Sequence, residues 1–363
     1  MKKMLLFLIL LLSLSQIQFE SAQDAADNIT VGWNLGNTLE ANGDWIGLYS
    51  EGNPENYETA WGNPVTSPEL IKAVKESGFN AVRIPVTWYE HINDNGTVDS
   101  EWLGRVQEVA DYIIGQDMYC IINVHHDSGS GWLRATPECY EENSEKFALI
   151  WSNIATQFRD YDDRLIFEGF NEMLDNEGHW GNAESDEAYT VVNEFNQLFV
   201  DTVRSTGGNN CYRNLMVQVY SGMCADGAFD NFVLPVDSTD GHLMIQVHNY
   251  DPQPFTWTSV DYAAPTDQWG TESEKEHIEN LFEKLSDFSE KQGVPVIVGE
   301  CGADYKENEE VRKAYVSHFF SCAAENNIKC FWWDTGAMSL FDRNKCCEKY
   351  PEIIDVIMEE VEK

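Results

Sequence analysis

Eight short apolar runs, separated by longer amphipathic stretches, constrain the fold of this chain more than any other feature. Each run is typical of a buried strand, and the runs occupy residues 29–36, 79–86, 119–125, 165–171, 215–220, 243–250, 294–300 and 330–334. The stretches between them are typical of helices and include residues 67–76, 101–115, 144–159, 186–206, 271–291 and 308–325. Ser67 and Pro68 form a good helix start, and Gly293 follows a helical stretch where a glycine is expected.

Strands that are apolar along almost their whole length, joined by helices, predict a parallel sheet that is buried on both faces. Eight such units within 363 residues predict an α/β fold, a single-domain TIM (β/α)8 barrel. An open, doubly wound sheet is the alternative arrangement of the same units. The fifth connection, residues 221–242, is only weakly helical, so we expect the fifth unit to be the least regular.

Polar and aromatic residues collect at or near the ends of these strands. Seven of the eight runs carry them, namely Asn37 and Glu40; Arg83; His125, His126 and Asp127; Asn171 and Glu172; His248 and Tyr250; Glu300; and Trp332, Trp333 and Asp334. A TIM barrel carries its active site at the carboxyl ends of its strands. These residues are therefore candidates for one common site, with Trp332 expected to point the other way, into the core.

Two glutamates in this group, Glu172 and Glu300, point to the hydrolysis of glycosidic bonds. Retaining glycoside hydrolases hold two carboxyl groups ~5–5.5 Å apart. At that separation and an effective dielectric constant near 20, two negative charges repel by roughly 3 kcal/mol, which separates two pKa values by about 2. We therefore expect one glutamate to stay protonated while the other is ionised. Aromatic faces and Asn or His side chains nearby suit sugar rings and hydroxyls.

Eight motifs, in order along the chain, carry a resemblance to a known family. They are GWNLGNTLE, WGNP, GFNAVRIPVTW, IINVHHD, FEGFNE, HNYDP, VIVGE and FWWD. With them the chain resembles glycoside hydrolase family 5 from about residue 29 to residue 342, especially the bacterial and rumen-fungal endoglucanases of its fourth subfamily. The resemblance implies a TIM barrel, hydrolysis with retention of configuration, and neither a metal nor another cofactor.

The resemblance also implies a role for each candidate residue. It makes Glu172 the acid/base and Glu300 the nucleophile. It gives supporting catalytic roles to Arg83, Asn171, His248 and Tyr250, and contact with sugar to Asn37, Glu40, His125, His126 and Trp333. The chain departs from the family pattern at Met173, where proline is usual, and at Cys301, where phenylalanine is usual; these changes affect the shape of the site rather than its catalytic groups.

Two of these residues have alternative interpretations. Arg83 either binds the nucleophile or neutralises Glu168, a buried acid that lies about 13 Å below Glu172 along the same strand. His125 and His126, together with Asp127, resemble metal ligands, but no third cluster at the usual spacing accompanies them. Contact with sugar is the favoured interpretation of the two histidines.

The first 22 residues are typical of a secretory signal peptide, with Lys2 and Lys3 before an apolar run from Met4 to Leu12. We place the catalytic domain at residues 23–363 and expect a secreted, extracellular monomer; an uncleaved membrane anchor is the alternative. A formal net charge of −39 makes nucleic acid and anionic membranes poor partners. Disulfides are plausible for such a destination, although nine cysteines cannot all pair.

These features together predict a secreted endo-β-1,4-glucanase that acts on cellulose and related β-glucans. The same chemistry on xyloglucan, mixed-linkage β-glucan, xylan or mannan is the nearest alternative, since a fold does not fix specificity. A non-catalytic glycan-binding barrel is disfavoured because both glutamates and the neighbouring asparagine are present. A metal-dependent hydrolase is a third alternative, which sensitivity to a chelator would reveal.

Overall fold

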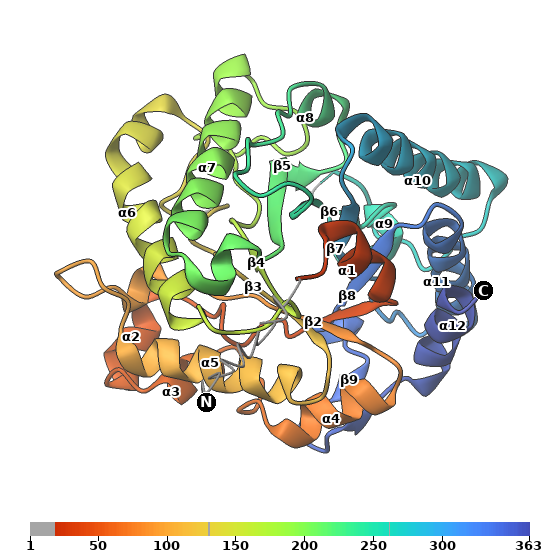
Figure 1. The fold of residues 1–363 in the computed structure, drawn as a ribbon. Coiled ribbons are helices and arrows are strands. Elements are labelled where there is room, and N and C mark those ends of the chain that lie inside the picture. The colour runs from red at the N-terminus through yellow and green to blue at the C-terminus, as the bar shows by residue number, and fades with distance from the viewer. Residues whose placement is uncertain (1–18, 130, 261) are drawn as a thin grey trace, which may run out of the picture.

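The computed structural model describes residues 19–129, 131–260 and 262–363, and it is a closed barrel of eight parallel strands surrounded by helices (Figure 1). Each strand pairs with the next along the chain, and β1 pairs with β8 to close the barrel. The strands are β1 (Gly32–Asn34), β2 (Ala81–Ile84), β3 (Tyr119–Asn123), β4 (Leu165–Glu168), β5 (Leu215–Met223), β6 (Leu243–His248), β7 (Val296–Cys301) and β8 (Lys329–Trp333). The predicted TIM barrel is confirmed, and the open sheet is excluded.

Long helices form the outer layer of the barrel (Figure 1). They are α4 (Pro68–Glu76), α5 (Ser100–Ile114), α6 (Pro137–Gln157), α7 (Asp186–Ser205), α10 (Glu272–Gln292), α11 (Glu309–Glu325) and α12 (Pro351–Val361). Helix α4 begins as predicted, because the Ser67 side chain accepts a hydrogen bond from the Leu70 N–H. Helix α6 begins seven residues earlier than predicted, since Thr136 caps it and Pro137 occupies its first turn.

Shorter elements complete the connections. They are α1 (Ala22–Asn28), α2 (Asp44–Ser50), α3 (Pro54–Glu58), α8 (Asp226–Asp230), α9 (Gln253–Thr256), the 3-10 turns η1 (Tyr89–His91), η2 (Gly208–Cys211) and η3 (Gly336–Met338), and the antiparallel pair β9 (Phe341–Asp342) and β10 (Cys347–Glu348). The fifth connection carries only the short α8, as its weak helical pattern predicted.

Strand β5 ends in an irregularity that matters for the site. Its pairing register with β6 shifts between Gln218 and Met223, and Ser221 and Gly222 have φ values of 56° and 69°. A Cβ atom on Gly222 would lie 3.4 Å from the Cγ of Glu172. The left-handed backbone favours glycine here, and the absence of a side chain leaves room for Glu172.

The amino end of the barrel is closed by α1, which lies across it in Figure 1. Ala22, Ala25, Ala26 and Ile29 pack there against inward-facing residues of the strands, including Phe331. A second, larger core fills the space between the strands and the outer helices. Trp332 is buried in that core, as predicted, and its indole N–H donates to the carbonyl of Met338.

Residues just before the predicted boundary at residue 23 contact the body of the barrel. Phe19 is buried, and the Glu20 N–H donates to Asp163 while the Glu20 carboxylate accepts from the Tyr119 hydroxyl at 2.6 Å. Residues 19–22 therefore contact the barrel, and the predicted boundary at residue 23 stays a prediction. The predicted signal peptide otherwise falls on residues 1–18, which lie outside the described residues.

All nine cysteines have free thiols, so the structure does not bear out the expectation of disulfides. Several, such as Cys120 and Cys330, lie in the strands and pack as buried apolar side chains. Within residues 19–129, 131–260 and 262–363, no helix is both long and apolar enough to cross a membrane.

Candidate active site

The barrel brings the two predicted glutamates together at the carboxyl ends of its strands. Glu300 lies in β7, and Glu172 follows β4 by four residues. Carboxylate oxygens of Glu172 and Glu300 and a ring nitrogen of His248 all lie within 4.8 Å of one another. Glu172 and Glu300, which are more than one hundred positions apart in the sequence, therefore share one small volume.

The Glu300 carboxylate is held on both of its oxygens. Arg83 Nη1 donates to Glu300 Oε1 at 2.6 Å, and the Tyr250 hydroxyl donates to Oε2 at 2.9 Å. Only 7% of the Glu300 side chain is exposed. A cation and a hydroxyl donor this close fix the orientation of the carboxylate.

The Glu172 carboxyl group has a different environment. Its Oε1 lies 2.7 Å from His248 Nδ1, and 23% of its side chain is exposed. The same His248 nitrogen lies 3.6 Å from Glu300 Oε2. Glu172 is thus the more accessible of the two glutamates, and one hydrogen bond joins it to His248.

Two neighbouring side chains have pKa values that reflect these carboxylates. Burial lowers the pKa of His248, but the nearby charges of Glu300 and Glu172 outweigh burial, so its pKa is raised above the ordinary value. Burial and the charge of Glu300 both raise the pKa of the Tyr250 hydroxyl well above its ordinary value. Tyr250 is therefore a neutral hydrogen-bond donor at any moderate pH.

Arg83 bridges Glu300 to a second acid deeper in the barrel. Its Nε and Nη2 each donate to the Glu168 carboxylate at 2.7 Å, and Nη2 also donates to Asn171 Oδ1 at 2.9 Å. Arg83 and Glu168 are fully buried. Both interpretations of Arg83 therefore hold, since one guanidinium binds the candidate nucleophile and neutralises the buried acid.

Three polar residues that sequence reasoning missed complete this network. Asn34 Oδ1 accepts from Arg83 Nη1 at 3.0 Å, whereas Asn123 and Gln246 donate to Glu168 at 3.0 and 2.9 Å. Each is a polar residue inside an apolar strand, which was a usable signal. In a parallel barrel such a side chain points either inward or toward the helices, and only an inward one reaches the site.

His125, His126 and Trp333 form a connected wall. The rings of His125 and Trp333 stack with centroids 5.8 Å apart and 6° between their planes, and the His125 and His126 rings meet edge to face at 4.6 Å. Burial lowers the pKa of His125 well below its ordinary value and that of His126 to about 4. Both rings are neutral near pH 7, which suits hydrogen bonding to hydroxyl groups.

Asn37 lies farther along the same side of the barrel. It helps to line a cavity of about 460 Å³ together with Trp61, Asn63, Arg343 and residues of the connection that follows β8. The centroids of the Trp61 and His126 rings lie 5.5 Å apart. This contact joins the cavity to the wall formed by His125, His126 and Trp333.

The structure corrects the assignment of Glu40 to contact with sugar. The Glu40 side chain is fully buried, and its carboxyl oxygens accept hydrogen bonds from the backbone N–H groups of Asn37 and Thr38. Burial raises its pKa to about 7 against these hydrogen bonds. Glu40 therefore shapes the loop that presents Asn37, because its side chain has no exposed surface to offer a ligand.

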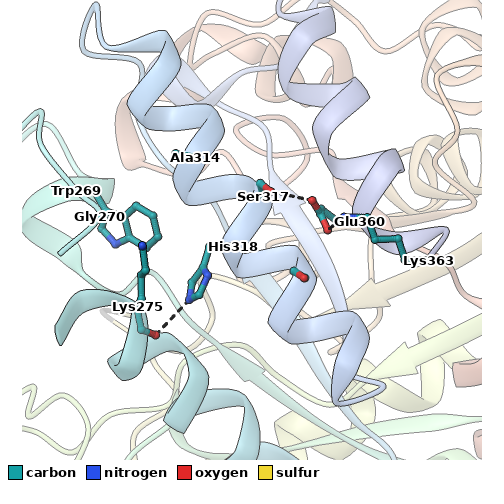
Figure 2. A pocket seen from close by; sticks show the side chains of 9 residues that line it. Trp269, Gly270, Lys275, Ala314, Ser317, His318, Glu360 and Lys363 are labelled. Atoms are coloured by element: carbon teal, nitrogen blue, oxygen red, sulfur yellow. Dashed lines mark hydrogen bonds and ion pairs between the residues drawn. The ribbon is translucent and has the colours of Figure 1, made fainter. Parts of the chain in front are cut away.

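A cavity of about 580 Å³ lies between the outer helices α10, α11 and α12, and contains none of the predicted site residues (Figure 2). Its polar groups are largely bonded to one another. Ser317 donates to Glu360 at 2.7 Å, and His318 Nε2 lies 3.2 Å from the carbonyl of Lys275. The candidate site is therefore the carboxyl end of the barrel.

A parallel barrel with two facing carboxyl groups at this end is an arrangement that glycoside hydrolases use. Comparison with protein families gives the same class: the family described as cellulase (glycosyl hydrolase family 5) matches residues 39–339. The chain belongs to glycoside hydrolase family 5.

Relatives in bacteria agree with this family. The chain is 36% identical over 352 residues to the cellulase/esterase CelE of Acetivibrio thermocellus, covering 93% of this chain and 40% of that protein. It is 34% identical to an endoglucanase A of Clostridium longisporum, covering 89% of this chain and 61% of that protein. It is 35% identical to an endoglucanase A of Ruminococcus albus, covering 93% of this chain and 92% of that protein.

Solved structures share the fold over almost the whole chain. A broad-specificity endoglucanase of Ruminococcus champanellensis with bound cellotriose has a TM-score of 0.87 and 36% identity, covering 95% of this chain and all of that one. A variant of a family 5 enzyme of Prevotella bryantii, in complex with a xyloglucan tetradecasaccharide, has a TM-score of 0.86 and 36% identity, covering 95% and 99%.

Proposed function

We propose that this chain is a secreted, retaining endo-β-1,4-glucanase that hydrolyses internal bonds of cellulose and related β-glucans. The observation that carries the proposal is the pair of carboxyl groups whose oxygens lie within 4.8 Å, one anchored by a cation and the other more accessible. Retaining enzymes hold their carboxyl groups ~5–5.5 Å apart, whereas inverting enzymes need ~6.5–9.5 Å to admit a water molecule.

In the first step Glu300 attacks the anomeric carbon, and Glu172 protonates the leaving glycosidic oxygen. The roles follow from the surroundings of each group. Arg83 and Tyr250 hold Glu300 as an oriented carboxylate, which is the form a nucleophile needs. Glu172 has no arginine partner among the described contacts and is hydrogen-bonded to His248, which suits a general acid.

In the second step Glu172 accepts a proton from a water molecule, and that water attacks the anomeric carbon of the glycosyl-enzyme. The greater exposure of Glu172 supports this role, because water must reach its carboxylate. As the bond to Glu300 breaks, the carboxylate is released next to Arg83 and Tyr250, which again stabilise its charge. Two inversions at one carbon give net retention.

We assign the remaining predicted residues to substrate binding. Trp333 offers its ring to a sugar face, and the neutral imidazoles of His125 and His126 bind hydroxyl groups. Asn171, whose side-chain oxygen is bonded to Arg83, keeps its amide nitrogen for a sugar hydroxyl. The chain of sugars extends past His126 toward Asn37.

Substitution tests these roles. Glu300→Gln is expected to abolish turnover of a soluble β-glucan, and Glu172→Gln to lower kcat by about 10²–10⁴-fold, the usual contribution of a general acid/base. Glu360→Gln, in the cavity of the outer helices, is the matched control and should keep wild-type activity. The assignment is wrong if Glu300→Gln, folded by circular dichroism, retains near-wild-type rates.

Xyloglucan is a second candidate substrate, because the similar Prevotella bryantii enzyme binds a xyloglucan oligosaccharide and the Ruminococcus champanellensis enzyme is described as having broad specificity. Release of reducing sugar from cellulose, mixed-linkage β-glucan, xyloglucan, xylan and mannan separates these alternatives. Comparable rates on cellulose derivatives and xyloglucan would identify a broad-specificity enzyme, and activity on xylan or mannan alone would contradict the proposal.

We propose that catalysis needs no metal or other cofactor and that the enzyme works as a monomer. Glu172, His248 and Glu300 have ligand atoms close enough to hold a metal ion. Arg83, however, places a fixed positive charge 2.6 Å from Glu300, which disfavours a second cation there. Dialysis against a chelator is therefore expected to leave the rate unchanged, and light scattering to give the mass of one chain.

A further inference from the structure

Exposed aromatic side chains are unevenly distributed over this barrel. Among the described residues, the aromatic side chains with the greatest exposure are Trp45, Tyr49, Trp180, Tyr212 and Tyr262. Four of the five lie in connections that leave β1, β4 or β6 at its carboxyl end, whereas Tyr212 precedes β5 at the opposite end. Aromatic exposure is thus concentrated at the end of the barrel that holds the candidate site, and large exposed apolar groups there mark a binding surface.

Trp45 and Tyr49 form the densest part of this surface. They lie one helical turn apart on α2 and are 50% and 48% exposed. Their rings stack with centroids 5.9 Å apart and 30° between planes. The two rings therefore pack against each other while both stay partly exposed, and we call this aromatic pair the α2 platform.

Packing against the core and against the backbone of Gly43 fixes the position of the α2 platform. Ile46, in the same helix, is fully buried and anchors α2 to the core. Gly43 precedes the helix with a φ of 141°, and a Cβ atom there would lie 2.7 Å from the indole nitrogen of Trp45. The indole thus packs directly on the backbone of Gly43, so the ring is both exposed and preorganised, which lowers the entropic cost of binding.

Contacts tie α2 to the carboxyl end of the barrel. The Gly43 N–H donates at 3.0 Å to Glu90, which lies in η1, just past the end of β2. The connection that carries α2 also carries Trp61 and Asn37, which line the cavity beside the candidate site. A polymer that leaves the site beside Trp61 and Asn37 therefore leaves next to the connection that carries the α2 platform.

The charge near the α2 platform selects its partner. Asp44, Glu51 and Glu55 are exposed around it, and the whole chain carries a net charge of −39. An anionic membrane, a nucleic acid or a second copy of this acidic chain would be repelled. A neutral chain of flat sugar rings with hydroxyl groups at the edges fits both the stacked rings and the carboxylates around them.

We propose that Trp45 and Tyr49 form an accessory platform that binds β-glucan chains outside the catalytic groups and retains long polymers on the enzyme. The proposal rests on the proposed glucanase function and deepens it, because it predicts that chain length, not bond type, decides how much the platform contributes.

The test compares Trp45→Ala/Tyr49→Ala with Tyr212→Ala, a control that removes an aromatic ring of matched exposure, 50%, from the opposite end of the barrel. Each protein is run through native gels that contain hydroxyethyl cellulose, and each is assayed on cellotetraose. We expect the double variant to bind the polymer at least about fivefold more weakly, the factor for a loss of about 1 kcal/mol of stacking. Its kcat/KM on cellotetraose should stay within about twofold of wild type.

Three results would overturn the proposal. In the first, hydroxyethyl cellulose slows the migration of the double variant as strongly as that of wild type. In the second, Tyr212→Ala reduces this retardation as much as the double variant does. In the third, the neutral β-glucan does not slow the wild-type protein. If all the proteins hydrolyse cellotetraose and their retardation does not differ, the proposed glucanase function holds and only the α2 platform is refuted. If the double variant does not fold by circular dichroism, Trp45→Ala and Tyr49→Ala singly carry the same comparison.

Discussion

At the scale of single residues, the site is organised by Arg83. This guanidinium contacts Glu300, Glu168, Asn171 and Asn34 at distances from 2.6 to 3.0 Å and is fully buried. Burial disfavours its charge, but Glu168 and Glu300 more than compensate and raise its pKa above the ordinary value. Two carboxylates on one buried cation leave a net negative charge, which the amides of Asn123 and Gln246 help to stabilise by donating to Glu168.

The first prediction concerns Glu168. Glu168→Gln breaks a buried ion pair and should lower the free energy of unfolding by about 3–5 kcal/mol. It should also lower kcat, because Arg83 loses the partner that holds it against Glu300. Glu58→Gln is the matched control, since Glu58 forms a buried ion pair with Arg105 at 2.9 Å that does not involve the candidate site. Urea unfolding and rates on a soluble β-glucan measure both effects.

The control is expected to lose stability while keeping kcat. A Glu168→Gln protein with wild-type stability and no activity would instead place Glu168 in the chemistry.

The second prediction concerns His91 and acid stability. Burial lowers the pKa of His91 to about 3, although Asp99 opposes this in part, and its ring stacks on Trp102 with centroids 3.7 Å apart. The unfolded chain, with a histidine pKa of about 6.5, binds more protons than the native state between these values. The native state is therefore destabilised as the pH falls from about 6.5 toward 3.

His91→Phe removes this group and should flatten the pH dependence of unfolding. Relative to the variant, wild type should lose about 1.4 kcal/mol per pH unit below about pH 6. Urea unfolding at pH 6.5, 5.5 and 4.5 measures the difference in slope. Parallel slopes would mean that His91 is protonated in the native state or reaches water by local opening.

At the scale of elements, α1 ties the first described residues to the barrel. It closes the amino end of the barrel through Ala22, Ala25 and Ala26, and the Ser21 side chain caps it by accepting from the Asp24 N–H. The Ala22 N–H donates to the carbonyl of Gly241 at 2.7 Å. Residues just before the predicted boundary thus bond to the body of the barrel, and cleavage at residue 22 would remove them.

The third prediction is that the mature protein begins at or before Phe19. A version that begins at Gln23 should be less stable than one that begins at Phe19 by about 0.5–2 kcal/mol, the range for loss of a helix cap, with the Glu20 contacts adding to it. Thermal unfolding compares the two versions, and amino-terminal sequencing of the secreted protein locates the cleavage. A mature terminus at residue 23 together with equal melting temperatures would refute this role of residues 19–22.

At the scale of the whole molecule, the net charge of −39 acts on every partner that approaches. The field of such a surface repels polyanions and is screened over about 10 Å at 0.1 M salt. It has no effect on a neutral polymer. The charge therefore bears on which substrates reach the site, independently of the contacts made inside it.

The fourth prediction follows from this charge. The KM for carboxymethyl cellulose, an anionic polymer, should fall as ionic strength rises from about 10 to 150 mM, since the Debye length shrinks from about 30 to 8 Å. The KM for neutral mixed-linkage β-glucan should not change. Steady-state kinetics on both polymers at the two ionic strengths provide the measurement and its control, and an equal response would show that long-range repulsion does not limit binding.

The barrel and its two glutamates were predictable because both are visible in the pattern of apolar runs along the sequence. Apolar runs at regular intervals follow from burying a parallel sheet on both faces, and polar residues that interrupt several of these runs near their ends mark the site. Glu172 and Glu300 stand at those interruptions. The true start of α6 was less predictable, because Thr136 acts through a local cap outside the periodic pattern.

The sequence by itself determined the fold class, the family resemblance and the identity of the paired carboxyl groups. Each of these depends on residue types and on their spacing along the chain. Only the tertiary structure decided which side chains meet. It joined Arg83 to both Glu168 and Glu300, turned Glu40 away from any ligand, and stacked Trp45 on Tyr49 in the open. Such contacts depend on the closure of the barrel and the paths of its loops, which bring together residues that no local pattern relates.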